Sequence, residues 1–219
     1  MISSEQALES LYRKIFDCRL CAKAIPSVVP RVVNPRSVRS PLVLAAQAPS
    51  EKGVRVSGRH WVGDDGRVRP YGGAFLDKHL RRIGYTVDWN GSDLASPYTT
   101  NVMHCFPGSK GPRDRKPGTK ELRACKQWWL AELEIVRPKV VILLSAPAAS
   151  SFGKVLGDGR SFRDLLLHQG EVVDLGPVSV HRFVLPHPTA PYRWTPPDGR
   201  DMGKDTLYQA VLDQVAALL

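Results

Sequence analysis

Features that are absent from this 219-residue sequence narrow what the protein can be. There is no internal repeat, no low-complexity segment and no long hydrophobic run. The residues that follow Met1 instead alternate at the spacing of an amphipathic helix, with Ser3 and Gln6 placed as a capping box. Such a stretch is neither a secretion signal nor a membrane span. We therefore expect a cytoplasmic protein that has no membrane partner.

Acidic residues are few compared with basic ones. The chain has 21 Asp and Glu against 31 Lys and Arg, which gives a formal net charge of +10. A positive surplus of this size favours a polyanionic partner, nucleic acid before an acidic membrane, although a solvated basic surface has the same composition. Hydrophobic residues make up 42% of the chain, which is enough for a substantial core.

Cysteine is also scarce, and the chain has only Cys18, Cys21, Cys105 and Cys125. In the cytosol, four thiols are more often metal ligands or free thiols than disulfides. The pair Cys18 and Cys21 can turn two thiolates toward one metal centre, so a single four-thiolate site is expected, with zinc and an iron-sulfur cluster as candidates. Zinc ribbons normally use two short pairs, whereas 19 residues separate Cys105 from Cys125. The alternative is that these two are buried apolar residues.

A glycine-punctuated loop follows the first apolar run, and it lacks the signatures of a phosphate loop. Residues 43–46 are apolar, and from Gln47 to Gly66 the chain is rich in glycine and charge. The loop has no Gly-Lys-Ser/Thr ending, and its glycines do not follow the dinucleotide-binding spacing. At the end of a core strand, such a loop is expected to form one wall of a functional site.

Short apolar runs alternate with helical patterns along the chain. The runs have the length and β-branched content of buried strands, at 41–48, 99–105, 139–145 and 178–188. Helical patterns lie at 72–85, 119–138, 146–152 and 204–219. This alternation predicts an α/β layered sheet with right-handed crossovers. No linker is long enough to separate domains, so one domain over residues 1–219 is expected.

Three of the expected strands end in polar, loop-forming sequence. These ends are Gln47 onward, Asn101 to Cys105, and HPT at 187–189. Functional groups collect where the strands of such a sheet end, so we expect these segments to meet.

Taken in order, these segments resemble motifs of the iron-sulfur uracil-DNA glycosylases, families 4 and 5 of that superfamily. AQAP at 46–49 resembles the family's Gly-x-Ala-Pro, and SGRHWVGD at 57–64 resembles Thr-Gly-Arg-x-Phe-x-Gly-Asp. TNVMHC at 100–105 resembles Thr-Asn-x-Val-x-Cys, and HPT at 187–189 resembles His-Pro-Ser/Ala. Each motif alone is weak, but four in this order with the cysteines interleaved form a strong signal.

The resemblance implies a fold, a cofactor and a reaction. The fold is a three-layer α/β/α sandwich with a central, mainly parallel sheet. The cofactor is a structural 4Fe-4S cluster, held by Cys18, Cys21, Cys105 and Cys125. The reaction is hydrolysis of the N-glycosidic bond of a base extruded from DNA.

Three residues of the motifs take roles at the extruded base by this resemblance. Trp61 would stack on the base, Asn101 would read its edge with an amide, and His187 would donate a hydrogen bond to the oxygen of the departing base. The alternatives are ordinary: a loop-packing tryptophan, a strand-end turn asparagine and a satisfied histidine.

Water positioning has two candidates. Gln47 stands where family 4 commonly has an acidic residue, and an amide can orient water or a base but cannot act as a general base. Asp64 matches the aspartate that closes the first motif of family 5, with Asp65 beside it, and is the stronger candidate. A solvated loop position is the alternative for Asp64.

Two basic loops are expected to contact DNA as the protein's partner. In the loop at 107–118, Lys110, Arg113, Arg115 and Lys116 would bind phosphates. In the loop at 191–203, Arg193 or Trp194 would fill the gap that the extruded base leaves. We expect the protein to act as a monomer.

The identity of the base stays open. Departures from both families fall in the pocket motifs, at Ala46, Gln47, Ser50 and Trp61. Uracil is the first expectation, and a bulky phage-modified base, such as a glucosylated hydroxymethylcytosine removed in phage defence, is the alternative. A non-catalytic iron-sulfur DNA-binding module that keeps the fold is the third possibility.

Overall fold

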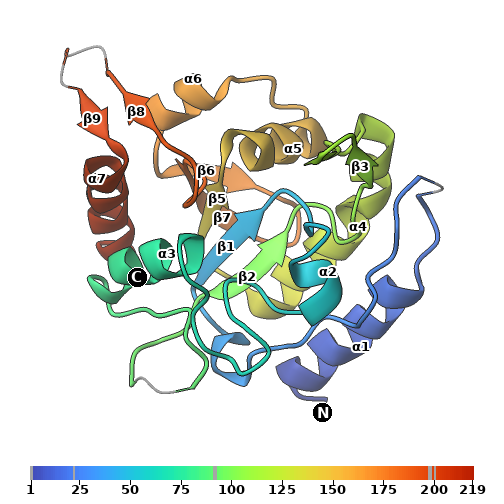
Figure 1. Cartoon of the computed structure of the whole chain (residues 1–219). Coiled ribbons are helices and arrows are strands. Elements are labelled where there is room, and N and C mark those ends of the chain that lie inside the picture. The colour runs from blue at the N-terminus through green and yellow to red at the C-terminus, as the bar shows by residue number, and fades with distance from the viewer. Residues whose placement is uncertain (1, 22, 91–92, 197–198, 200) are drawn as a thin grey trace.

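The computed structural model describes residues 2–21, 23–90, 93–196, 199 and 201–219. At its centre is a five-stranded sheet in the order β2-β1-β5-β7-β6 (Figure 1). The strands are β1 (Leu42–Ala46), β2 (Tyr98–Asn101), β5 (Val140–Leu144), β6 (Glu171–Asp174) and β7 (Ser179–Leu185).

Four of the five strands run parallel, and only β6 is antiparallel to its neighbour β7. Ala46 at the end of β1 lies opposite Asn101 at the end of β2, and Leu144 at the end of β5 lies opposite Leu185 of β7. The carboxyl ends of these four strands therefore share one edge of the sheet, where the loops after them meet.

Helices cover both faces of the sheet, which confirms the predicted three-layer α/β/α architecture. On one side α1 (Ser4–Asp17) packs on α4 (Thr119–Val136), which packs on α5 (Ala146–Leu156). On the other side α3 (Gly72–Arg81) packs on α7 (Lys204–Ala216), as Figure 1 shows. Among the described residues, no helix combines the length and the hydropathy needed to cross a membrane.

Short elements complete the chain and lie mostly in the loops. They are the helices α2 (Val54–Ser57) and α6 (Phe162–Leu167), the 3-10 turn Pro35–Ser37, and two hairpins built from β3 (Ser109–Lys110) with β4 (Arg113–Asp114) and from β8 (Arg193–Trp194) with β9 (Met202–Gly203). The sequence patterns did not predict α2, α6 or β6. These elements are too short, and β6 too exposed, for hydrophobic periodicity to mark them.

The strand predicted at 99–105 ends earlier, at Asn101. Beyond that point the amides of Val102 and Met103 donate to the carbonyls of Ala46 and Gln47 at the end of β1. These bonds keep the apolar residues that follow β2 buried without extending the ladder, and they bring Cys105 close behind Asn101.

The first helix forms as its cap predicts. The amide of Gln6 donates to Oγ of Ser3 at 3.2 Å, and the amide of Ser3 donates to Oε1 of Gln6 at 2.9 Å. Residues 8, 11, 12 and 15 of α1 are buried at helical spacing against the core. This packing fixes where α1 ends and therefore where Cys18 begins the next segment.

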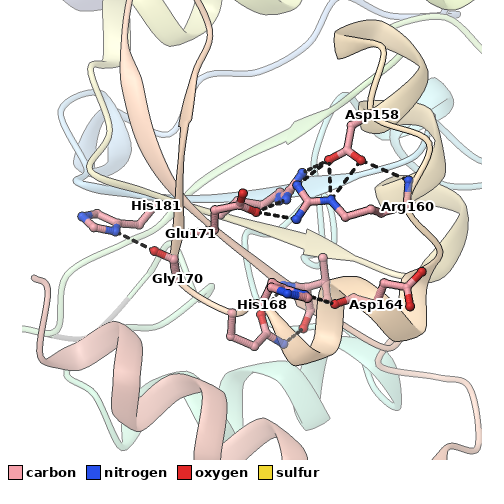
Figure 2. Close-up of polar contacts among 10 residues, drawn as sticks. Asp158, Arg160, Asp164, His168, Gly170, Glu171 and His181 are labelled. Carbon is pink, nitrogen blue, oxygen red and sulfur yellow. Dashed lines mark hydrogen bonds and ion pairs between the residues drawn. The ribbon is translucent and has the colours of Figure 1, made fainter.

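A four-membered ion cluster holds β7, the strand that leads to His187 (Figure 2). Arg182 on β7 is 2% exposed and contacts Asp158 at 2.8 Å and Glu171 at 2.6 Å. Arg160 contacts the same two carboxylates, each at 2.8 Å. Hydrogen bonds from Arg160, and next from Arg182, hold the pKa of Asp158 well below its usual range.

We predict that Asp158→Asn lowers the free energy of unfolding at neutral pH by about 1–3 kcal/mol, because Arg182 stays buried after losing one of its two carboxylates. Folding lowers the pKa of Asp158, so the contribution of its carboxylate is complete above the ordinary aspartate pKa of about 4 and is lost as pH falls below it. The difference between parent and variant should therefore shrink below about pH 4. Urea unfolding across pH measures it.

Asp213→Asn is the matched control, since Asp213 is exposed on α7 and the change removes the same charge. If Asp158→Asn lowers the free energy of unfolding no more than Asp213→Asn does, the cluster adds nothing to stability.

Candidate functional site

A pocket of about 320 Å³ opens at the shared edge where β1, β2 and β7 end. The glycine-rich loop after β1 and the start of α3 form its other walls, as the sequence predicted for that loop. Of the residues expected at the site, the structure brings three to this pocket, Trp61, Asn101 and His187. His60, Arg69 and Thr189 also line it, and the sequence interpretation assigned none of them a role.

Trp61 reaches the pocket because α3 begins with two glycines. A Cβ at Gly73 would lie 2.7 Å from the carbonyl oxygen of Trp61, and one at Gly72 would lie 2.6 Å from Cγ2 of Thr189. Trp61 itself has a φ of +62°, a conformation that L residues rarely adopt. Its ring centroid is 5.6 Å from that of His187, at an interplanar angle of 46°. An aromatic ring and an imidazole thus border the same cavity.

The hydrogen bonds of His187 decide where its ring proton lies. The backbone N–H of Thr189 donates to Nδ1 at 3.2 Å, and Oγ1 of Thr189 is 2.8 Å from the same nitrogen. Nδ1 is therefore an acceptor, which leaves the proton on Nε2. Burial, and next the charge of Lys204, lower the pKa of His187. At neutral pH the ring is a neutral donor through Nε2.

Asn101 and His60 contact each other at the pocket. Nδ2 of Asn101 lies 2.9 Å from Nε2 of His60, and both residues are buried. On the other side of the ring, the guanidinium of Arg31 lies 3.4 Å from Nδ1. Burial, and next the charge of Arg31, hold the pKa of His60 well below its usual range. His60 is thus a neutral ring fixed between a cation and an amide.

Arg31 belongs to a buried polar network centred on Glu132 of α4. Glu132 is fully buried and receives hydrogen bonds from Arg31 at 3.0 Å, Tyr98 at 3.0 Å and Thr100 at 2.5 Å. Nε2 of His104 lies 3.4 Å from the same carboxylate. The network pairs a buried cation with a buried anion and satisfies the remaining oxygens, as buried charges require. No periodicity or motif had marked Arg31 or Glu132.

Gln47 and Asp64 do not line this pocket, contrary to the expectation that all the candidate residues meet there. Nε2 of Gln47 donates to Oγ of Ser151 at 3.2 Å and to the carbonyl of Pro147 at 3.4 Å, so its side chain points toward α5. Asp64 is exposed in a turn closed by a hydrogen bond from the amide of Gly66 to the carbonyl of Gly63. It borders a separate hollow beside α1.

The four cysteines line one cavity of about 210 Å³ beneath the end of β2. Cys18 and Cys21 come from the segment after α1, Cys105 from the segment after β2, and Cys125 from α4. Within the described residues, no three His, Cys, Asp or Glu side chains lie close enough to hold a single metal ion.

The environment of the cysteines fits thiolates that are bound to a metal centre. Burial, and next Cys18 and Cys21, raise the pKa of the Cys105 thiol to about 11, and burial raises the pKa of Cys125 further. Thiolates in such a place need a metal's positive charge beside them. The backbone N–H of His104 donates to Sγ of Cys125 at 3.3 Å, which is the kind of bond that tunes cluster sulfurs.

The basic loop at 107–118 has three cationic side chains that are exposed and one that binds another residue of the protein. Lys110, Arg113 and Lys116 are exposed, and none of them forms an ion pair with a described residue. Arg115 instead binds Glu121 with two nitrogens, at 2.9 and 2.6 Å, and donates to the carbonyl of Pro107. It holds the loop on α4 rather than extending into solvent.

The second loop also differs from the expectation. Arg193 pairs with Asp201 at 3.0 Å, and the half-buried Trp194 packs against the core with its indole N–H enclosed. Neither side chain projects as a free wedge; residues 197, 198 and 200 of this loop lie outside the described residues. Tyr71 is the exposed aromatic beside the pocket, 86% exposed with a φ of +59°. It adjoins Gly72, and no sequence motif had marked it.

Comparison with known proteins gives a consistent set of similarities. The sequence model of the uracil DNA glycosylase superfamily matches residues 34–209. The type-4 uracil-DNA glycosylase of Archaeoglobus fulgidus is 28% identical over 146 residues, which are 66% of this chain and 62% of that protein. The type-5 uracil-DNA glycosylase of Pyrobaculum aerophilum is 29% identical over 148 residues, 67% of this chain and 61% of that protein.

A further type-4 uracil-DNA glycosylase, from Thermotoga maritima, is 27% identical over 152 residues, which are 69% of each chain. The match with the two relatives from Archaeoglobus fulgidus and Pyrobaculum aerophilum spans about three fifths of their length.

We predict that Gly73→Ala destabilises the fold by about 1–3 kcal/mol, since its methyl group would meet the backbone oxygen of Trp61 rather than a flexible side-chain end. Chemical unfolding followed by circular dichroism measures the change. Gly159→Ala is the matched control, because a Cβ there has nothing within 4 Å. Equal midpoints for the two variants would show that α3 does not need the close approach to Trp61.

Proposed function

The chain belongs to the uracil-DNA glycosylase superfamily, and on that premise we propose that it is a DNA glycosylase. We propose one such domain over residues 1–219, acting first on uracil, which the type-4 and type-5 relatives carry in their names. The observation that carries the proposal is one cavity that collects the ring of Trp61, the amide of Asn101 and the neutral imidazole of His187.

The pocket suits a base that has left the DNA stack. A base inside a duplex is inaccessible, so the enzyme must extrude it and offer a ring, an edge reader and a donor in place of its lost contacts. Trp61 provides the stacking surface and Asn101 the polar group for the base edge.

His187 supplies the proposed chemistry. As the N-glycosidic bond breaks, negative charge develops on the base, and the Nε2–H of His187 is positioned to stabilise it on a base oxygen. The ring is neutral because burial lowers its pKa. A neutral imidazole donates this hydrogen bond without needing to be protonated again in each turnover. Water then attacks the sugar carbon that the base leaves.

Neither Gln47 nor Asp64 positions water in this mechanism. The side chain of Gln47 is bonded to α5, and Asp64 lies in an exposed turn away from the pocket. Stabilisation of the leaving base, rather than activation of water by a carboxylate, is therefore the main source of catalysis in this proposal.

We predict that His187→Ala slows single-turnover release of uracil by about 10²–10³-fold with little change in DNA affinity, because it removes a contact made mainly in the transition state. Release is measured as alkali-labile sites in a labelled duplex. His168→Ala is the control, since that exposed ring bonds the carbonyl of Asp164 and does not line the pocket. A parent-like rate for His187→Ala would contradict the mechanism.

Gln47→Ala and Asp64→Asn are predicted to release uracil within about tenfold of the parent rate. That change is smaller than the loss of about 10²–10³-fold expected when a donor to the developing negative charge is removed. A loss as large as that of His187→Ala for either variant would return the water-positioning role to that residue.

We also propose that the cysteine cavity holds a 4Fe-4S cluster through Cys18, Cys21, Cys105 and Cys125. The support is a donor set of four thiols around one cavity, with a backbone N–H bonded to one sulfur. When bound, the cluster would supply a covalent tie among α4, the end of β2 and the segment after α1, and no step of the hydrolysis.

Purified protein is accordingly predicted to be brown and to contain about four irons per chain. Cys125→Ser should lose iron and absorbance together, because it removes a ligand on a core helix. Metal analysis and visible absorbance make the measurement. Colourless protein with one zinc per chain would contradict the cluster.

For DNA binding, we propose that Lys110, Arg113 and Lys116 contact phosphates and that Arg115 holds their loop in place. The triple alanine variant of the three exposed residues is predicted to make the slope of log K against log salt less steep by about 0.7–0.9 for each lost contact. The reason is that DNA releases fewer counterions on binding when fewer phosphates are neutralised. Lys139→Ala is the control, since Lys139 precedes β5 at the opposite edge of the sheet. An unchanged slope in the triple variant would mean that the loop is only a solvated surface.

A second candidate substrate is a bulky modified base, such as a glucosylated hydroxymethylcytosine. The observation in its favour is that one wall of the pocket consists of small residues, Ala46, Ala48, Ser50 and Gly53. Parallel assays on uracil-containing and modified duplexes separate the two candidates. Binding without release of any base would support a non-catalytic DNA-binding module instead.

A further inference from the structure

One end of the Asn101 amide is bonded to His60, and the other end is not satisfied by the protein. Nδ2 lies 2.9 Å from Nε2 of His60, whereas Oδ1 is buried without a hydrogen-bond partner among the described residues. Both residues line the pocket. The two ends of an amide have the same shape, so the chemistry of the partner decides which end faces His60.

Arg31 fixes the tautomer of that partner. A guanidinium can only donate, and it lies 3.4 Å from Nδ1 of His60, so Nδ1 must present its lone pair. Arg31 is itself held by Glu132 at 3.0 Å and Thr100 at 3.1 Å. Its guanidinium is therefore restrained from turning away from the ring. The proton of the neutral His60 ring then lies on Nε2.

A donor at Nε2 requires an acceptor, and the amide of Asn101 has only its carbonyl oxygen to offer. With the amide turned so that Oδ1 accepts from Nε2–H, each bond from Glu132 through Arg31 and His60 to the Asn101 carbonyl joins a donor to an acceptor, and the amino group of Asn101 takes the place that has no partner among the described residues. The opposite orientation sets N–H against N–H and leaves a buried carbonyl without a donor. The amino end of Asn101 is thus the end that remains for a bound base.

We propose that His60, oriented by Arg31, is a specificity-determining residue: it holds the amide of Asn101 so that an N–H donor, and not the carbonyl, meets the base. The base edge that complements this donor carries a carbonyl, as uracil does at C4, whereas cytosine carries an amino group there. The donor therefore favours a base with a carbonyl at this position over a base with an amino group there. This inference rests on the proposed glycosylase function and adds to it the residue pair that sets the polarity of reading.

The hydrogen-bond arrangement can be tested without any substrate. Two-bond ¹H–¹⁵N spectra of the intact purified protein distinguish a ring protonated at Nε2 from one protonated at Nδ1, with His60→Gln used to assign the signal. We expect the Nε2–H form for His60. The Nδ1–H form would overturn the proposal, because Nε2 would then accept from the amino group of Asn101.

The consequence for substrate choice is tested by single-turnover release from matched duplexes that carry uracil or cytosine. His60→Ala frees the amide to rotate and should lower the uracil-to-cytosine ratio of rates at least tenfold. His60→Gln keeps a side-chain donor and should restore part of that ratio, which a merely structural role would not do. Asn101→Asp, an acceptor only, should lower the ratio furthest.

The outcomes separate this inference from the proposed function. If the folded His60 variants keep the uracil-to-cytosine ratio of the parent within about twofold, the change is too small for the loss of one hydrogen bond. In that case His60 does not orient the amide of Asn101, although the protein is still a glycosylase. If the parent releases no base from any duplex, the proposed function fails, and the spectra of His60 alone decide whether the amide is oriented as inferred.

Discussion

The buried ion pair between Arg31 and Glu132 is the interaction on which both candidate sites depend. Glu132 is fully buried, and a charge in that position is tolerated only when it is paired and hydrogen-bonded. Its partners come from the loop before β1, from β2 and from the segment after β2, so the network joins α4 to the edge of the sheet. The pair thus adds side-chain bonds to the backbone pairing with β1 that holds the end of β2.

The end of β2 serves two sites at once. Asn101 lies at the proposed base pocket, and Cys105 lies in the cysteine cavity. The Glu132 network lies between them, with His60 on the pocket side and His104 on the cysteine side. The proposed cluster, although it takes no part in the proposed hydrolysis, would therefore help to hold the amide of Asn101 that we propose reads the base.

Backbone strain and close packing gather at the same pocket. Trp61 and Tyr71 both have positive φ angles, and Gly72 and Gly73 have no room for a side chain. Strain of this kind persists only where the surrounding structure over-determines it, as binding sites often do. The ion cluster around Arg182 acts from the other side, because it restrains the strand that precedes His187.

The sequence by itself determined the alternation of helices with four of the five strands of the sheet, and the motif segments that carry Trp61, Asn101 and His187. Periodicity, caps and motif spacing depend only on residues that are close together in the sequence, so they can be recognised without knowledge of the fold. Only the tertiary structure decided which way side chains turn once a strand has ended: Gln47 toward α5, Asp64 toward solvent and Arg115 onto Glu121. It alone revealed the contacts of Arg31 with His60 and Glu132, which lie 29 and 101 positions away. Such pairs depend on loop conformation and buried charge, which no short window of sequence contains.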